Sequence, residues 1–508
     1  MGNLIRILLQ VLSVAALTGL TNLLRCANAQ TFWRYLLALA IPAIVAGCAV
    51  GPNFGRPEPP AVASYIPEPL VLPAYAGGSG MPEQSFKKDQ DSPSQWWTLF
   101  KSPSLNILIE QALKKNPTIE AAEAALRVAQ ENQYAQEGAY FPSVQAGFSP
   151  SKQRVAKILS SPLGSGDSIF NLHTAQVSVS YVADVFGGNR RQVESLEALA
   201  ELQRFQLLAA QLTVTSNVVN AAVQEASLRA QIAATEEIIG IQQEQLDITR
   251  HQFRLGSVAE ASVIAQEATL AQTQTNLPPL QKQLAQQRSA LAVLAGRFPG
   301  DPIIGNFVLG SLNLPAELPI SLPSRLVDRR PDIRAAEAQM HSASAQVGVA
   351  VSNMLPQFTI SANGGTIATQ IANLLTSENR FWSIAGAITQ PIFAGGALLH
   401  RKRAAEAAYD QAAAQYRSTV LAAFQNVADT LHALQYDVGA YQAALMSEQA
   451  SKSILDIVRK QMELGDINYL TVLNADQAYR QAVINRVQAQ ANRFADTAAL
   501  FQALGGGW

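Results

Sequence analysis

The sequence predicts an α+β membrane protein in which one structural unit occurs twice, each copy supplying two β-strands and a pair of long antiparallel helices. The first observation is an internal repeat, because residues 116–130 (NPTIEAAEAALRVAQ) match residues 330–344 (RPDIRAAEAQMHSAS). The second is that each half combines short alternating segments with a very long proline-free stretch. We therefore divide the chain into an N-terminal apolar segment, an anchor and tether, repeat 1, a linker and repeat 2, at residues 1–47, 48–103, 104–300, 301–324 and 325–508.

The N-terminal segment carries two apolar runs, at about residues 7–24 and 35–46. The second run is too short to span a bilayer but suits the apolar part of a secretory signal. It ends in Val45-Ala46-Gly47-Cys48, which resembles a bacterial lipobox, so we expect cleavage before Cys48 and lipid on its thiol. The only other cysteine is Cys26, which leaves the mature chain no partner for a disulfide. Ala49, in place of aspartate, resembles lipoproteins sent to the outer membrane.

Other interpretations of this N-terminus stay open. Two apolar runs are more than one signal needs, so the first is either sequence upstream of the true start or a membrane segment. Ala27-Asn28-Ala29 offers a rival cleavage site. Cys48 as a buried or unused thiol is the remaining alternative.

The predicted tether is rich in proline. Residues 49–103 hold ten of the 25 prolines in the chain, which disfavours regular helices. We expect an extended segment laid over a surface.

Four segments alternate apolar with small or polar residues, two in each repeat. They are residues 144–148, 177–181, 358–362 and 381–393. Four such strands cannot close on themselves, and an open sheet edge in hydrocarbon leaves backbone groups unsatisfied. If the strands enter a membrane, several chains must share one barrel, since bacterial barrels begin at about eight strands. Two chains would be the minimum, and three would leave a lumen wide enough for solutes. A soluble coiled-coil protein with two hairpins is the alternative.

Helical patterns occupy most of the rest. Residues 105–113 follow helical spacing, Asn116-Pro117 interrupts, and a second run continues to about Glu137. Residues 188–252 and 399–462 would each form a helix roughly 95 Å long at about 1.5 Å per residue. Gly256 and Gly465 follow these stretches, where each helix must turn back, so each repeat is expected to contain a helical hairpin.

Composition and motifs exclude several classes of function. Lys and Arg total 37 against 38 Asp and Glu, which gives no basic excess for nucleic acid. No Gly-Lys pair occurs, so a P-loop is excluded. The five histidines lie at least 32 residues apart, too far for a helical metal pair. We therefore expect no cofactor, no metal and no catalytic residue, and the protein is not expected to be an enzyme.

From about Ser94 to Trp508 the chain resembles the outer-membrane efflux proteins, the TolC-like family, and within it the lipoproteins paired with resistance-nodulation-division pumps. The matching segments are GCAVGPNF at 47–54, QWWTLFKSPSLNILIEQALKKNPTIEAA at 95–122, PIFAGG at 391–396 and QALGGGW at 502–508. The resemblance implies a homotrimer with a shared 12-stranded β-barrel and a periplasmic tunnel of helices. It also implies a passive exit duct in the bacterial outer membrane, lipid-anchored and reaching into the periplasm. The duct would receive substrates from a periplasmic adaptor and an inner-membrane pump.

The same resemblance places the adaptor contacts at the hairpin tips, and the tunnel constriction near them. The tip residues are Arg254, Leu255, Gly256, Leu464, Gly465 and Asp466. In the family, carboxylates and an arginine-centred set of hydrogen bonds help to hold the constriction closed. Here the two aspartate positions hold Thr471 and Asn474, the arginine position holds Ile467, and the partners from the first repeat are Ala261 and Ser262. The charged lock is therefore absent as such.

We hypothesise that this constriction closes by packing of Tyr469 and Leu473, with Asn474 as a neutral polar ring. Asp466 and Asp476 are candidate substitutes, although on a helix they point differently from Asn474. Asn474 facing a neighbouring helix is the alternative.

Two other functions share these sequence features. One is an exit duct for type I protein secretion, which has the same fold, and the other is a structural coiled-coil outer-membrane lipoprotein. The polar, alanine-rich faces of the helices select no cargo, so selection is expected to lie with the pump.

Overall fold

The computed structural model describes residues 49–68, 84–156, 158, 167–302, 305–467 and 469–507, without the side chains of 469 and 470. Cys48 and both N-terminal apolar runs lie outside these residues. The chain forms two compact units. The first contains residues up to 54, with 133–195 and 343–408, and the second contains residues 55–132, 196–342 and 409 onward.

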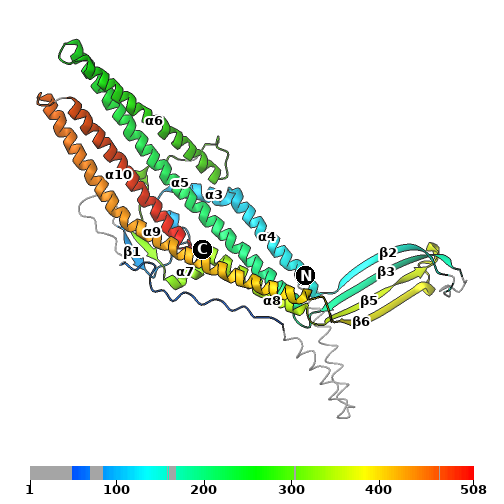
Figure 1. The fold of residues 1–508 in the computed structure, drawn as a ribbon. Helices are drawn as coiled ribbons and strands as arrows, with labels where there is room; N and C mark the ends of the chain where they lie inside the picture. Colours follow the sequence, from blue (N-terminus) through cyan, green and yellow to red (C-terminus); the bar gives the residue numbers. More distant parts are fainter. Residues whose placement is uncertain are drawn as a thin grey trace. The chain divides into compact units, whose positions relative to one another are not determined.

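The first unit is built around a four-stranded antiparallel sheet of order β2-β3-β5-β6 (Figure 1). The strands are β2 (Ser143–Arg154), β3 (Ile169–Ala183), β5 (Gln357–Ala368) and β6 (Arg380–Thr389). The two hairpins meet where β3 pairs with β5, with Tyr181 opposite Ile360. This arrangement confirms two strands for each repeat. Among the described strands, β2 and β6 each pair along one side only.

Long helices and short turns complete this unit. Helices α4 (Pro117–Glu137) and α8 (Pro331–Ser352) end in it, and helices α5 (Gly188–Arg254) and α9 (Ala397–Glu463) begin in it. The 3-10 turns are η2 (Gly138–Tyr140), η4 (Ile371–Asn373) and η5 (Ser377–Asn379). In both repeats the order is therefore helix, two strands, long helix, as the internal repeat predicts.

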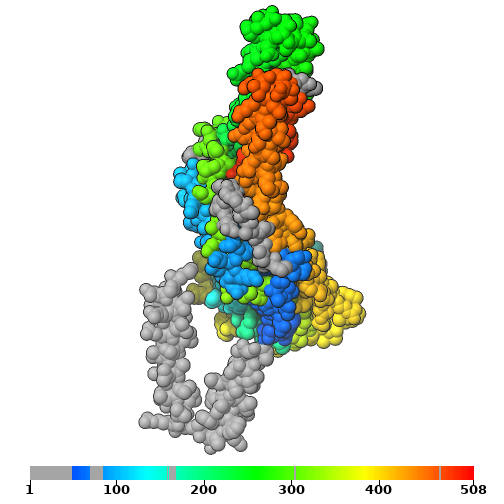
Figure 2. Space-filling model, turned by 90° about the vertical axis from the view of Figure 1, so that its left-hand side faces the viewer, coloured from blue at the N-terminus to red at the C-terminus, as the bar shows by residue number. Residues whose placement is uncertain are grey.

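The second unit contains two helical hairpins, α5 with α6 (Glu260–Leu294) and α9 with α10 (Tyr469–Ala503) (Figure 1). Helices α5 and α9 have 67 residues each, and α6 and α10 have 35 each. Gly256 and Gly465 occupy the turns with φ of +74° and +80°, a backbone conformation that favours glycine. The predicted hairpins and the lengths of the long helices are confirmed. Figure 2 shows the α5–α6 tip in green and the α9–α10 tip in orange at the same end of this unit.

The remaining elements of the second unit are short. They are β1 (Ser85–Lys88), η1 (Trp96–Phe100), α3 (Pro103–Lys115), η3 (Leu309–Ser311), β4 (Glu317–Ile320) and α7 (Pro323–Arg329). Strands β1 and β4 form a parallel pair. Residues expected to be tether and linker thus fold onto the helices in part. Trp96 and Phe100 explain why, since both are fully buried and Trp96 stacks on Phe501 of α10 at 5.3 Å.

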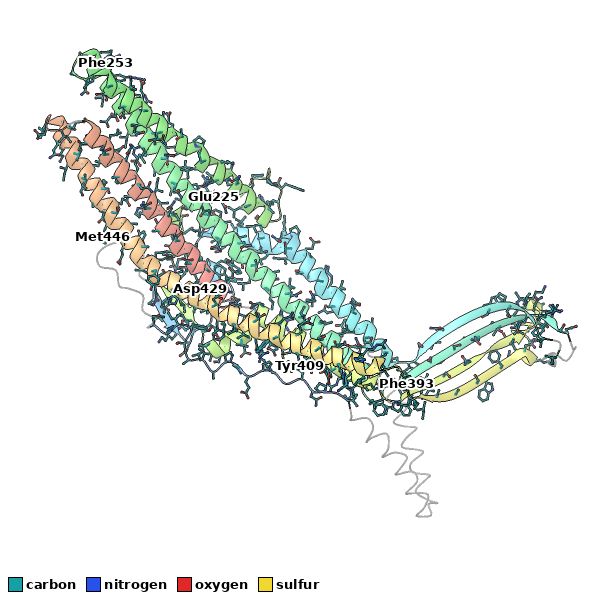
Figure 3. The ribbon with its side chains drawn as sticks, viewed as in Figure 1. Glu225, Phe253, Phe393, Tyr409, Asp429 and Met446 are labelled. Atoms are coloured by element: carbon teal, nitrogen blue, oxygen red, sulfur yellow. The ribbon has the colours of Figure 1, made fainter. Side chains whose placement is uncertain are left out.

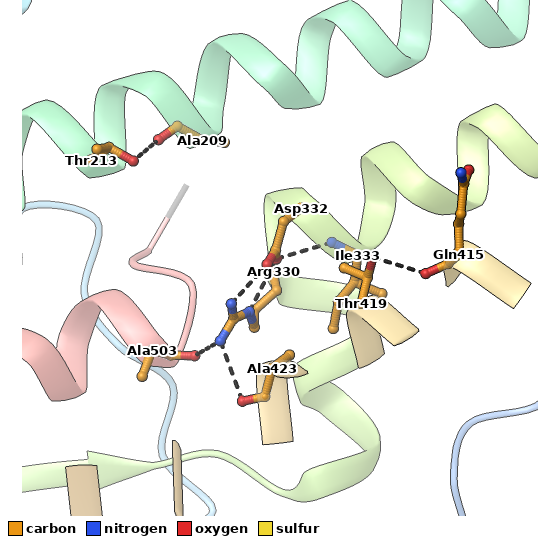
Figure 4. A network of polar contacts seen from close by, with 9 residues as sticks. All are labelled: Ala209, Thr213, Arg330, Asp332, Ile333, Gln415, Thr419, Ala423 and Ala503. Atoms are coloured by element: carbon orange, nitrogen blue, oxygen red, sulfur yellow. Dashed lines mark hydrogen bonds and ion pairs between the residues drawn. The ribbon is translucent and has the colours of Figure 1, made fainter. Parts of the chain in front are cut away.

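The two repeats also share a tertiary contact. In repeat 1, Asn116 donates from Nδ2 to the carbonyl oxygen of Leu294, at the end of α6 (2.9 Å). In repeat 2, Arg330 donates from a terminal guanidinium nitrogen to the carbonyl oxygen of Ala503, at the end of α10 (2.9 Å, Figure 4). Asp332 orients this guanidinium through contacts of 2.7 and 3.0 Å. The residue before each Pro thus secures the end of the returning helix.

Candidate functional site

The tips of the two helical hairpins are built in the same way. The amide of Gly256 donates to the carbonyl of Phe253 (2.9 Å), and that of Gly465 donates to the carbonyl of Met462 (3.0 Å). Each glycine follows a leucine that reaches into solvent, Leu255 at 71% and Leu464 at 77% exposed. Both leucines therefore expose apolar surface at the tip of a hairpin.

The structure places all six predicted tip residues at these turns. Arg254, Leu255, Gly256, Leu464, Gly465 and Asp466 are exposed. Phe253, one residue before them, is exposed as well (43%, Figure 3).

The predicted constriction residues divide into two sets. Thr471 and Asn474 lie three residues apart on α10, and both are exposed. Leu473 is only 7% exposed in the chain, and Ile467 packs against an apolar cluster that includes Val472. On α6, Ala261 is exposed and Ser262 is half-buried. Tyr469 begins α10, and its side chain lies outside the described atoms. Of the predicted constriction residues on α10 whose side chains are described, Thr471 and Asn474 are the two that are accessible to another surface.

A polar network that sequence analysis missed lies directly after Asn474 on α10. Asp476 forms ion pairs with Arg480 of the same helix and with Arg459 of α9 (3.6 Å). Arg480 also donates to the hydroxyl of Thr273 on α6 (3.1 Å), and the amide oxygen of Gln242 on α5, in the orientation that its neighbours require, accepts from Arg480 at 2.8 Å. The network joins all four helices of the two hairpins. Asp476 is therefore held by two arginines of its own chain.

A pair of acids, Asp437 of α9 and Asp496 of α10, joins these two helices. Asp437 shares a side-chain hydrogen bond with Asp496, and its Oδ2 is buried without a partner in the described part of the chain. Burial, followed by this hydrogen bond and the charge of Asp496, raises the pKa of Asp437 from 3.8 to about 7.

The sheet of the first unit has one strongly apolar face. Trp382, Ile384 and Ile388 on β6 are 78%, 71% and 69% exposed, and their even spacing puts them on the same face of the strand. Small residues alternate with them, including Ser383 and Ala385. Such alternation of lipid-facing and lumen-facing residues is typical of outer-membrane strands.

The described residues contain no group of three or more His, Cys, Asp or Glu placed to hold a metal ion. Nor does any helix in that part of the chain have the length and hydropathy needed to cross a membrane.

Comparison with known proteins identifies the fold and the class of function. The family model described as outer membrane efflux protein matches residues 108–297 and 322–506. The chain belongs to the outer membrane efflux protein family. The family's two matched segments coincide with the two repeats, and its members are transport proteins, not enzymes.

Similar efflux proteins cover almost the whole chain. The pyoverdine export outer membrane protein OpmQ of Pseudomonas putida is 27% identical over 94% of this chain and 98% of its own length. The toluene efflux pump outer membrane protein TtgC of the same species is 29% identical over 93% of this chain and 96% of its own length.

Solved structures of outer-membrane channels share the fold. The channel OprN superposes with a TM-score of 0.80 at 26% identity, covering 91% of this chain and 100% of OprN. Campylobacter jejuni CmeC gives a TM-score of 0.82 at 22% identity, covering 91% of this chain and 95% of CmeC. The protein is thus an outer-membrane efflux channel with the TolC-like fold.

Proposed function

We propose that this efflux channel works as a homotrimer whose three sheets close into one 12-stranded barrel, with the helices forming a tunnel in the periplasm. The observation that carries the proposal is the four-stranded sheet, which combines an apolar face with one side of β2 and one side of β6 that pair with no other described strand. Unpaired strand edges are costly in hydrocarbon, and pairing β6 of one protomer with β2 of the next removes both. Three protomers give about 12 strands, enough for a lumen that passes solutes.

The proposal includes a lipid anchor, which places the chain in the lipoprotein branch of the family. Its support is the lipobox that ends at Cys48, together with the absence of any other cysteine after residue 26. Acyl chains such as palmitate on Cys48 would add hydrophobic attachment to that of the strands.

Adaptor and pump partners follow from the architecture. A passive duct has no energy source of its own, so an inner-membrane pump supplies the energy for export. A periplasmic adaptor docks at the exposed tips around Leu255 and Leu464. Pyoverdine and toluene, named for two relatives, are small organic molecules. We therefore favour export of small molecules over type I protein secretion.

The proposed constriction uses the accessible side chains of α10. In a threefold assembly, three copies of Asn474 and three of Thr471 would form neutral polar rings near the axis. Buried Leu473 would contribute through packing inside each protomer. The network around Asp476 and Arg480 would hold each tip rigid behind these rings.

Disulfide cross-linking tests the shared barrel. One cysteine is placed on β2 and one on β6, in a set of pairs that scans the register, in a chain whose mature form has only the lipidated Cys48. Oxidation should produce covalent trimers on a denaturing gel for pairs in register. Matched pairs on β2 and β5, which are not neighbours in the sheet, should stay monomeric. A complete scan that gives only monomers or dimers would refute the shared barrel.

A further inference from the structure

The residues that follow Cys48 occupy a slot in the first unit. The amide of Val50 donates to the carbonyl oxygen of Phe186 (3.0 Å), in the turn between β3 and α5. Arg191, on the first turn of α5, donates from Nε to the carbonyl oxygen of Val50 (3.1 Å) and from a terminal nitrogen to Oδ1 of Asn53 (2.7 Å). Backbone and side chain of this segment are thus both bound.

The slot fits the segment closely. A Cβ atom added to Gly51 would lie 2.4 Å from the Cα of Gly348 in α8, and one added to Gly187 would lie 2.7 Å from the Cα of Ala49. A Cβ on Gly348 would meet the side chain of Arg191 at 2.8 Å. Real Cβ atoms do not approach so closely, so the segment lies backbone to backbone against both repeats.

Arg191 makes the slot costly to leave empty. Its side chain is only 4% exposed, and within the unit it pairs with Glu194 (2.7 Å). Its other hydrogen bonds go to the N-terminal segment, namely to the carbonyl oxygens of Val50 and Gly51 and to Oδ1 of Asn53. Without the segment, a buried guanidinium would lose most of its hydrogen-bond acceptors.

The position of Arg191 is itself fixed by the start of α5. The carboxylate of Asp184 accepts from the amides of Asn189 (3.0 Å) and Arg190 (2.9 Å), so it caps the helix. Asp184 follows β3, which ends at Ala183. The slot is therefore built into the junction of strand and helix.

We propose that this slot, formed by Phe186, Gly187, Arg191 and Gly348, is the positioning site for the lipid-modified amino terminus of the mature chain. The described segment begins at Ala49, the residue that follows Cys48 in the sequence, and its Cα lies against Gly187 in the turn after β3. The acyl chains then enter the bilayer at the rim of the sheet, and the segment ties repeat 1 to repeat 2 there. Arg191 is a positioning residue in this account. The proposal rests on the proposed lipidation of Cys48.

Hydrogen exchange read by mass spectrometry tests the slot in the full-length channel extracted from outer membranes. Arg191→Ala should accelerate exchange of the peptide from Ala49 to Phe54 at least tenfold, while peptides of α10 keep the wild-type rate. Arg190→Ala, a change at the neighbouring exposed arginine, is the matched control and should leave both peptides unchanged. Arg191→Lys, which keeps the charge but loses the planar fork, should give an intermediate rate.

A second variant keeps the proposal testable if Arg191→Ala fails to fold. Asn53→Ala removes one acceptor from the segment and leaves the sheet and helices intact, and it should accelerate exchange at Val50 about threefold or more. The denatured mass of each sample reports the lipid on Cys48 separately. If the protein is acylated but Arg191→Ala and Asn53→Ala do not change its exchange rates, the slot does not position the segment, although Cys48 still carries the lipid. If the protein carries no acyl mass, Cys48 is not lipidated, and the slot then has no lipid-modified terminus to position.

Discussion

The acid pair between α9 and α10 gives a prediction about pH. Asp437 has a pKa raised from 3.8 to about 7 by burial and by Asp496. A carboxyl whose folded pKa exceeds its unfolded value binds its proton more tightly in the folded state. Its cost to stability is therefore absent below about pH 4, grows as the pH rises towards 7, and is constant above that. A pKa change of one unit corresponds to about 1.4 kcal/mol of stability, so a rise from 3.8 to about 7 corresponds to a cost of about 4 kcal/mol. Because the group keeps partial solvent access, we halve this to about 2 kcal/mol.

Asp437→Asn tests this reasoning. The neutral amide donates to Asp496 at every pH, so the variant should raise the opening free energy of α9–α10 by about 2 kcal/mol at pH 8 and change little at pH 4. Opening free energies come from hydrogen exchange at a series of pH values, corrected for intrinsic rates. Asp429→Asn, at an exposed acid of the same helix (Figure 3), is the control and should keep the wild-type dependence. If Asp437→Asn retains the wild-type slope between pH 4 and 8, the assignment of the proton to this pair is wrong.

Three further predictions concern the constriction, the core and the tips. Asn474→Asp should place three carboxylates in the proposed ring and increase cation selectivity in planar-bilayer recordings at pH 7; unchanged conductance and selectivity would remove Asn474 from the ring. Trp96→Ala should lower the free energy of unfolding of the second unit by about 3–5 kcal/mol, because it empties a fully buried site stacked on Phe501, and a loss below 1 kcal/mol in denaturant titration would contradict that packing. Leu464→Glu should reduce adaptor binding in a pull-down at least tenfold while the channel assembles normally, and Leu421→Glu, at an exposed leucine within α9 and away from the tip, should leave binding unchanged.

The helices were the most predictable part of the fold. The two 67-residue helices lack proline throughout and end just before glycine, so both their lengths and their turns follow from the sequence. Helix α6 is different, because it continues through Pro278 and Pro279, where local rules end a helix. Its equal length to α10 shows that packing in the hairpin overrides that local preference.

The positions of the strands could be predicted from the sequence, but their lengths could not. Strand β2 was predicted over residues 144–148, where alternation is clear, and it continues to Arg154 through Pro150. Alternation fades after Phe148, and only the pairing with β3 extends the strand. Proline is tolerated there because β2 is an edge strand of the protomer.

The side-chain networks could not be predicted, because their members are far apart in sequence. Arg480 reaches Thr273 across 207 residues, and Arg191 reaches Asn53 across 138. Alternation, periodicity and composition describe neighbours along the chain and carry no signal for such contacts. The repeat offset is the exception, since it relates Asn116 to Arg330 and both contact the end of a returning helix.

The shared barrel is tested most directly by native mass spectrometry of the channel extracted from outer membranes in mild detergent, followed by the denatured mass of its subunit. The account predicts a threefold assembly whose subunit begins at Cys48 and carries added acyl mass. A threefold assembly that retains residues 1–47 or 30–47 would keep the duct and remove the anchor. A monomer would contradict the account, because the open edges of β2 and β6 would then have no partner in the membrane.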